Sequence, residues 1–187
     1  MPMIQVNLLT GYSSALKDRL ARALTSVIGG ITRAKPDAIT LWIHEIDPEN
    51  YSRGGSPRLP GSGTTDPVML VLGYLDAMQE RNLETAQTYL AAPFAMTFPG
   101  SGELTSLGAL VEWSKDRYRH IEKTVMATNV AYETDHIVVM VQGTLAGQWP
   151  DGRNFSGVRF IDRFELREDL IHRQDVWNDL ANKKPPA

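Results

Sequence analysis

A break in composition constrains the fold more than any other feature of the chain. The segment GGSPRLPGSGTTDP, from Gly54 to Pro67, is dominated by Gly, Pro, Ser and Thr and carries no hydrophobic periodicity, which is typical of an interdomain linker. The 187 residues are enough for one domain or two small ones. We therefore expect two domains, at residues 1–55 and 66–181, with a flexible linker at 56–65 and a short tail at 182–187.

The segment before the linker has the pattern of a strand, a helix and a second strand. MIQVNLL and AITLWIHEI are apolar, strand-like runs, and between them apolar residues recur at helical spacing after a capping serine, Ser13. This order predicts a β-α-β unit with a parallel strand pair and a right-handed crossover. A unit of about 55 residues with only two strands buries little apolar surface. We therefore expect it to complete its core as a homo-oligomer.

The segment after the linker predicts helices first and a run of strands last. An amphipathic helix begins at Asp66 and Pro67, further helical segments and the short strand FAMTF follow, and four long strands occupy roughly residues 123–177. The turn sequences ETDH, PDGR and RED separate these strands. The fold class is therefore predicted to be α+β, with a curved antiparallel sheet that closes over helices.

Charge and composition exclude several classes of function. The net charge of −3 offers no basic field for a nucleic-acid partner. The chain has no cysteine, and its four histidines show no metal-ligand spacing, so we expect neither a metal nor another cofactor. No apolar run approaches the roughly 18 residues of a membrane span, and the N-terminus lacks the layout of a secretory signal. These features favour a cytoplasmic protein that acts on a small molecule.

The run GVRFIDRFEL places a carboxyl group on the apolar face of a strand. Strand alternation puts Phe160, Asp162 and Phe164 on one face. A buried carboxyl is costly unless it is hydrogen-bonded or kept neutral, and inward carboxyls often mark functional sites. Asp162 is therefore a candidate site residue that lines a cavity. The alternative is a structural carboxyl bonded to the backbone or to a tyrosine.

The last strand, IHRQDVW, offers a second carboxyl. If Ile171 and Trp177 face inward, strand alternation brings Arg173 and Asp175 into the same cavity, where Asp175 is a candidate base. The alternative is a simple ion pair between Arg173 and Asp175 at the rim of the sheet. His120 is a further candidate base. The aromatic residues expected in the pocket wall are Phe98, Trp113 and Tyr118.

The first 55 residues resemble 4-oxalocrotonate tautomerase and its relatives, through PMIQVNLLTGYS, the following helix, ITLWIHEIDPENY and the closing GG. In that family a proline freed by removal of the initiator methionine is a general base or nucleophile, which implies this role for Pro2. Tyr51 matches an aromatic residue near the proline, and Tyr12 and Thr40 stand where the family typically has substrate-binding arginines. An amine in an apolar pocket is less readily protonated, which suits a base. The family usually forms hexamers, which implies a hexamer here, with a dimer as the alternative.

From Asp66 to about Asp179 the chain resembles the nuclear-transport-factor-2-like superfamily, which includes SnoaL-like cyclases and ketosteroid isomerase. The resemblance rests on the order of the elements and on GYLDAMQERNLETA and FIDRFEL, and it implies a cone-shaped domain with an internal pocket. Tyr74 and Asp162 fall at the positions of the tyrosine and protonated aspartate of the isomerase oxyanion hole. Phe98 takes the position of its general base.

These features lead to three hypotheses. The first is a tautomerase or isomerase of a small enolisable carbonyl compound, with Pro2 as the base of one site and Tyr74 and Asp162 as donors to an oxyanion in the other. The second is a cyclase, lyase or hydrolase confined to the C-terminal pocket, with Asp175 as base. The third is a non-catalytic small-molecule binder whose N-terminal domain serves only for assembly.

Overall fold

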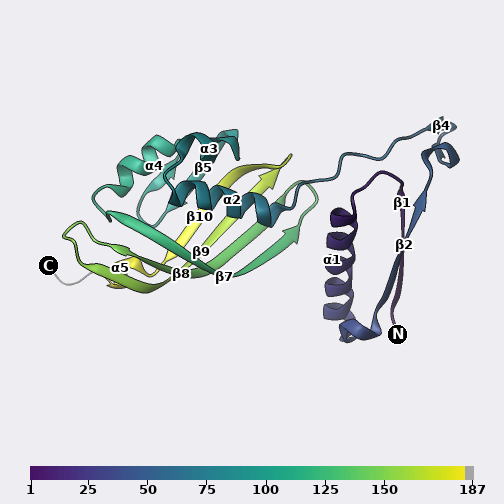
Figure 1. Cartoon of the computed structure of the whole chain (residues 1–187), viewed down its shortest axis with the longest axis horizontal. Coiled ribbons are helices and arrows are strands. Elements are labelled where there is room, and N and C mark those ends of the chain that lie inside the picture. Colours follow the sequence, from purple (N-terminus) through teal and green to yellow (C-terminus); the bar gives the residue numbers. More distant parts are fainter. Residues whose placement is uncertain (184–187) are drawn as a thin grey trace. The chain divides into compact units, whose positions relative to one another are not determined.

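The computed structural model describes residues 1–183, and the chain divides into two compact units, residues 1–64 and the residues from 65 onward (Figure 1). Most of the predicted tail at 182–187 lies outside the described residues. Within residues 1–183, no helix is long and apolar enough to cross a membrane.

The N-terminal unit is the predicted β-α-β arrangement. Strands β1 (Met3–Leu9) and β2 (Thr40–Ile46) pair in parallel along their whole length, and α1 (Ser14–Thr32) connects them. The Ser13 hydroxyl caps α1, because its oxygen accepts a hydrogen bond of 3.2 Å from the backbone N–H of Leu16. The remaining elements are two 3-10 helices, η1 (Pro36–Ala38) and η2 (Pro48–Asn50), and a short hairpin of β3 (Ser52–Arg53) and β4 (Ser56–Pro57).

The core of this unit is incomplete. Among residues 1–64, all of which the structure describes, none is buried. Helix α1 shields one face of the strand pair only partly, while the alternate residues Met3 and Trp42 keep 62% and 41% of their surface exposed. A unit that buries so little apolar surface gains little stability from it.

Part of the predicted flexible linker packs against this unit. The Arg19 guanidinium donates hydrogen bonds of 2.7 and 3.0 Å to the backbone oxygen and the hydroxyl of Thr64. The backbone of Gly63 lies so close to Leu16 that a Cβ at this glycine would stand 2.1 Å from the leucine Cδ1. The linker is therefore not free along its whole length, since side chains of α1 hold its last residues.

In the C-terminal unit, helices cover one face of a curved sheet. Helices α2 (Pro67–Gln79), α3 (Leu83–Thr88) and α4 (Leu107–Ser114) lie on one face of the sheet (Figure 1). Asp66 caps α2, since its Oδ1 accepts a hydrogen bond of 3.0 Å from the N–H of Val68. The six strands, in spatial order, are β6 (Gly102–Leu104), β5 (Leu90–Phe98), β10 (Leu170–Asn178), β9 (Asn154–Arg167), β8 (Ile137–Gln148) and β7 (His120–Tyr132), and α5 (Leu180–Lys183) follows them.

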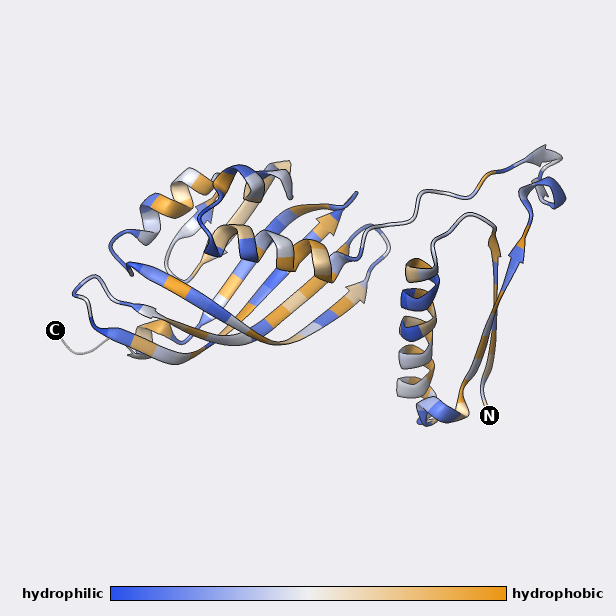
Figure 2. Cartoon of the chain, in the orientation of Figure 1, coloured by the Kyte–Doolittle hydropathy of each residue, from blue (hydrophilic) through white to orange (hydrophobic). Residues whose placement is uncertain are grey.

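The sheet is mixed rather than purely antiparallel as predicted. Strand β5 pairs in parallel with β10, whereas β5–β6, β10–β9, β9–β8 and β8–β7 are antiparallel. Apolar residues recur at alternate positions of β8 and β9, with Asp162 as the polar exception on β9, and the hydropathy along these strands alternates accordingly (Figure 2). They belong to the same core cluster as residues of α2. This alternation buries Val139, Val141, Val158 and Phe164 completely, and burial of such a side chain contributes about 1.5–3 kcal/mol.

Strand β10 contains a bulge that decides which of its residues face the core. Ile171 pairs with Leu166 on β9, yet Arg173 pairs with the adjacent Glu165. His172 is therefore an extra residue without a partner of its own. A bulge of this kind shifts the alternation of all later residues by one position.

The shift reverses the predicted orientation of the end of β10. Gln174 and Val176 are 4% and 7% exposed and share the inner face with Ile171, whereas Trp177 is 54% exposed. The prediction that Asp175 and Trp177 follow Ile171 into the cavity is wrong, because it assumed unbroken alternation. Gln174 takes the inward position instead.

Candidate functional site

The space between the helices and the inner face of the sheet is hollow. One hollow of about 470 Å³ is lined by α2, α4 and the start of β7, and a second of about 620 Å³ reaches β9 and α5. Both are lined by Phe98, Tyr118, Ile121 and Lys123. Because they share these residues, the two hollows adjoin, and together they are called the inner cavity below.

A buried carboxyl group on β9 is among the residues that line the second hollow. Asp162 on β9 is fully buried, as the strand alternation predicted. Its Oδ2 accepts hydrogen bonds from the Lys123 ammonium and from Gln174 Nε2, the latter at 3.1 Å. Its Oδ1 is buried and has no hydrogen-bond partner within residues 1–183. Oδ2 thus has two partners, while Oδ1 has none among the described residues.

A tyrosine on α2 continues this hydrogen-bonded chain. The Tyr74 hydroxyl donates to Gln174 Oε1 at 3.1 Å, and Gln174 in turn donates to Asp162. Burial, with a smaller contribution from the Asp162 charge, raises the pKa of Tyr74 well above its ordinary value. The phenol therefore stays protonated and orients the amide. Gln174 was missed in the sequence because the bulge at His172 leaves no visible trace there.

Lys123 changes the predicted chemistry of Asp162. Its Nζ contacts Asp162 Oδ2 and lies 4.6 Å from the centre of the Phe160 ring. Asp162 Oδ2 therefore accepts hydrogen bonds from both Lys123 and Gln174. The Tyr74 hydroxyl already donates to Gln174, so in this structure it is not the free donor that the predicted oxyanion hole requires. The alternation of Ile121 and Lys123 in IEKTV was a signal that could have identified this lysine.

The predicted aromatic wall lies where it was expected. Phe98 and Trp113 pack with ring centroids 5.3 Å apart, and Tyr118 lines both hollows. Trp113 Nε1 is buried without an acceptor in the described part of the chain. The cavity thus presents flat apolar surfaces, together with one unpaired donor and one unpaired acceptor.

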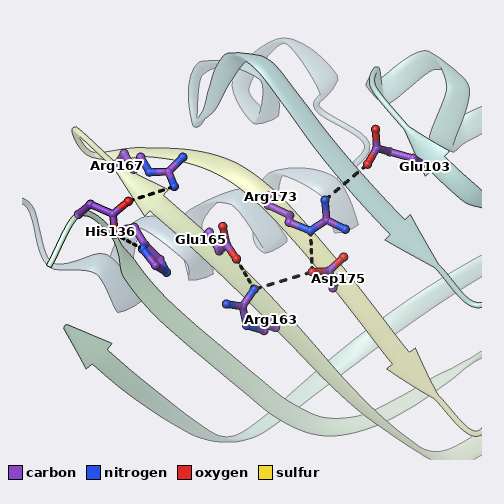
Figure 3. A network of polar contacts seen from close by, with 8 residues as sticks. Glu103, His136, Arg163, Glu165, Arg167, Arg173 and Asp175 are labelled. Atoms are coloured by element: carbon purple, nitrogen blue, oxygen red, sulfur yellow. Dashed lines mark hydrogen bonds and ion pairs between the residues drawn. The ribbon is translucent and has the colours of Figure 1, made fainter. Parts of the chain in front are cut away.

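The second predicted carboxylate lies on the opposite face of the sheet. Asp175 Oδ2 accepts a hydrogen bond of 2.8 Å from Arg173 Nε and lies 3.8 Å from Arg163 Nη1 (Figure 3). Arg163 also pairs with Glu165 at 2.6 Å, and Arg173 pairs with Glu103 at 3.5 Å. This ladder of ion pairs agrees with the alternative of a simple Arg–Asp pair.

The outer-face residues therefore do not join the site in the inner cavity. Asp175 and Trp177 line a groove of about 860 Å³ on the other side of the sheet, which shares some lining residues, Phe98 and Val176 among them, with the second hollow. His120 is exposed and lines neither hollow of the inner cavity. Asp175, Trp177 and His120 are therefore not among the residues that line the inner cavity.

In the N-terminal unit the predicted residues lie at two ends of the strand pair. The N–H of Thr40 donates to the Pro2 oxygen at 3.1 Å, so these residues adjoin. Tyr12 and Tyr51 line a hollow of about 550 Å³ at the other end, with Arg53 among its residues. The seven paired residues between the ends span about 20 Å. One copy of the chain therefore does not bring Pro2 and Tyr51 together.

Comparisons with known proteins give a separate result for each unit. Residues 2–57 match the family model described as tautomerase enzyme. A 4-oxalocrotonate tautomerase isozyme from Methylibium petroleiphilum is 30% identical over 30% of this chain and 88% of that one, with a TM-score of 0.29. No curated protein sequence matches the chain.

Solved structures match the C-terminal part of the chain. An NTF2-like protein from Burkholderia pseudomallei is 14% identical, covers 64% of this chain and 95% of its own, and superposes with a TM-score of 0.55. A protein from Jannaschia sp. CCS1, assigned as a SnoaL-like polyketide cyclase, is 19% identical over 67% of this chain and 100% of its own, with a TM-score of 0.52. At these identities the likeness concerns the fold alone.

Proposed function

Because residues 2–57 form a domain of the tautomerase family and the remainder of the chain has the NTF2-like fold, we propose that the protein is an isomerase that moves protons on small enolisable carbonyl compounds. It has two sites. Pro2 is the base of the first site, and Asp162 is the base of the second, in the inner cavity. The second assignment rests on one observation, the unpaired Oδ1 of a fully buried carboxylate.

The contacts of Asp162 suit a general base. Oδ2 is committed to Lys123 and Gln174, which holds the carboxylate in one orientation. Oδ1 takes the proton from the carbon next to the carbonyl, and the electron pair of the broken C–H bond moves to the carbonyl oxygen. The Lys123 ammonium is the nearest cation to the resulting enolate. Return of the proton to another position of the enolate completes the isomerisation.

Tyr74 and the aromatic residues have supporting roles in this proposal. The Tyr74 hydroxyl orients Gln174, and Gln174 orients Asp162. Phe98, Trp113 and Tyr118 hold an apolar substrate in the cavity and keep water from the base. Asp175, Arg173 and Trp177 have no part in the reaction.

Pro2 provides the base of the N-terminal site in the form it takes once Met1 is removed, as a free secondary amine. Tyr12, Thr40 and Tyr51 bind its substrate. Since Tyr51 lies about 20 Å from Pro2 along the strand pair, the aromatic residue beside each proline comes from a second copy of the chain. The site is therefore complete only in an oligomer.

The C-terminal site is tested by hydrogen exchange. The α-protons of 2-tetralone, a flat and uncharged aromatic ketone, exchange with deuterium oxide in a reaction that nuclear magnetic resonance follows directly. We expect Asp162→Asn to slow the protein-catalysed exchange by about a hundredfold, because an amide has no comparable basicity. Asp175→Asn is the matched control and should leave the rate unchanged. If the two variants behave alike, the protein binds ketones in this cavity without catalysing their isomerisation.

Assembly is tested by sedimentation. The open sheet face that carries Met3 and Trp42 needs a partner, so we expect a hexamer at micromolar concentration, or a dimer. Trp42→Asp places a charge in that contact and should reduce the particle to a smaller species. Met69→Asp, at an exposed position of α2, should not change it. A wild-type monomer would contradict the proposal.

A further inference from the structure

Basic side chains surround the solvent end of the inner cavity. Arg81, Lys115 and Arg119 line the first hollow and Arg117 lines the second, while Asp162 and Asp116 are the carboxylates among the lining residues. Arg81 and Arg119 are exposed and Asp162 is fully buried, so the cations lie at the entrance. In a chain with a net charge of −3, this concentration of positive charge is a local feature.

Three of these cations have no carboxylate partner. Arg81 Nη2 donates to the backbone oxygen of Arg119 at 2.5 Å, and Arg119 Nε donates to the backbone oxygen of Pro150 at 3.1 Å. The Arg117 guanidinium stacks on Trp113, 4.1 Å from the ring centroid. Within residues 1–183, no carboxylate lies in ion-pair contact with any of the three. Backbone oxygens and a ring hold these three guanidinium groups in place.

Two further groups at the same place are hydrogen-bond donors. The Arg117 guanidinium lies over the ring of Trp113, and the buried Nε1 of this tryptophan has no acceptor in the described residues. Burial raises the pKa of Tyr118, which keeps its hydroxyl protonated, whereas Ser114, Arg117 and Arg81 act in the opposite direction. Tyr118 lines both hollows, as Arg81 lines the first and Arg117 the second. Hydrogen-bond donors and positive charge thus lie together at the entrance, and a bound anion would provide the acceptor that Trp113 Nε1 lacks.

We propose that the inner cavity binds an aromatic carboxylate, with its carboxylate group at an entrance formed by Arg81, Arg117 and Arg119, the arginine entrance. Its ring lies against Phe98 and Trp113, and the rest of the molecule extends toward Asp162. This inference deepens the proposed function, on which it rests for the position of the reacting carbon. It adds the substrate class, an acid that carries both an aromatic ring and an enolisable carbonyl.

Two probes of the same shape and different charge test the inference. Calorimetric titration of the full-length protein compares 2-naphthoate with the neutral 2-naphthamide. We expect 2-naphthoate to bind at least about tenfold more tightly, because charge-assisted hydrogen bonds are the stronger ones. Added salt should reduce this preference, since the arginine entrance is open to solvent. Equal affinities, or no binding of 2-naphthoate, would overturn the inference.

Substitutions test whether the carboxylate group of 2-naphthoate binds at the arginine entrance. The double variant R81Q/R117Q should bring the affinities for the two probes within a factor of about two. R22Q, which removes one exposed positive charge of α1, should keep the full preference, and so should R53Q/R58Q in the N-terminal hollow. If the double variant does not fold, R117K carries the test, because lysine retains the charge but loses the planar, stacked guanidinium. A preference that survives in R117K and R81Q/R117Q would contradict the assignment.

Hydrogen exchange of the neutral ketone 2-tetralone tests the proposed function independently of this inference. 2-Tetralone has no anionic group, so its Asp162-dependent exchange in the wild-type protein does not require the arginine entrance. If that exchange occurs and the probes bind equally, only the arginine entrance is refuted. If the preference for 2-naphthoate holds and exchange is absent, the cavity binds acids without moving protons.

Discussion

Replacing Lys123 by methionine should destabilise the C-terminal domain by about 3 kcal/mol. Lys123 is the cation that pairs with the fully buried Asp162, and the substitution leaves that charge without a counter-ion. The cost falls at the lower end of the usual range because 21% of the lysine side chain is exposed, which allows water to replace part of the lost interaction. Urea unfolding followed by tryptophan fluorescence measures it. In a Trp42→Phe background, the remaining tryptophans all lie in the C-terminal domain.

The chain offers a matched control for this prediction. Lys115 forms an ion pair with Glu112 in which both side chains are more than half exposed, so Lys115→Met should change the free energy of unfolding by less than about 0.5 kcal/mol. The double variant Lys123→Met/Asp162→Leu removes both charges and should recover most of the lost stability. Equal effects of Lys123→Met and Lys115→Met would show that Asp162 does not depend on the lysine. The general-base assignment would then lose its support.

Replacing Pro2 by alanine should reduce the ketonisation of phenylenolpyruvate by about a thousandfold. The proline amine is the proposed base of the N-terminal site, and alanine supplies a primary amine of different geometry and basicity. The fold should persist, because Pro2 contributes only its backbone oxygen to the strand pair, through the N–H of Thr40. The rate is followed by the loss of the enol absorbance. Intact mass spectrometry establishes first that Met1 has been removed.

Two controls separate the proline from the rest of the molecule. A chain with an uncleaved N-terminal tag keeps Pro2 as an amide and should be as inactive as Pro2→Ala. Exchange of 2-tetralone, which belongs to the inner cavity, should be unchanged in both proteins. Similar ketonisation rates for wild-type protein and Pro2→Ala would exclude the proline as the base.

Local sequence patterns were sufficient to predict the helices and strands and the positions at which several of them begin. Ser13 and Asp66 were identified as helix caps from sequence, and both accept the expected backbone hydrogen bonds. The alternation in GVRFIDRFEL predicted that Asp162 faces the core, and it is fully buried. These features depend on residues within a few positions of one another, so the order of the side chains is enough to read them.

The site required information that no local pattern contains. Asp162 and Lys123 are 39 positions apart, and Tyr74 is 100 positions from Gln174. Which side chains meet in the cavity depends on how the strands pair across the sheet. The prediction for Asp162 did not include Lys123, because that lysine lies on another strand.

The bulge at His172 shows the same limit within a single strand. Alternation alone predicted that Asp175 faces the cavity, but the pairing of Ile171 with Leu166 and of Arg173 with Glu165 inserts one extra residue. A one-residue shift exchanges the two faces of a strand. The sequence by itself determined the two-part organisation, the elements and the inward aspartate. Only the tertiary structure decided that Lys123 and Gln174, rather than Asp175, lie beside that aspartate, because strand register is set by contacts between distant parts of the chain.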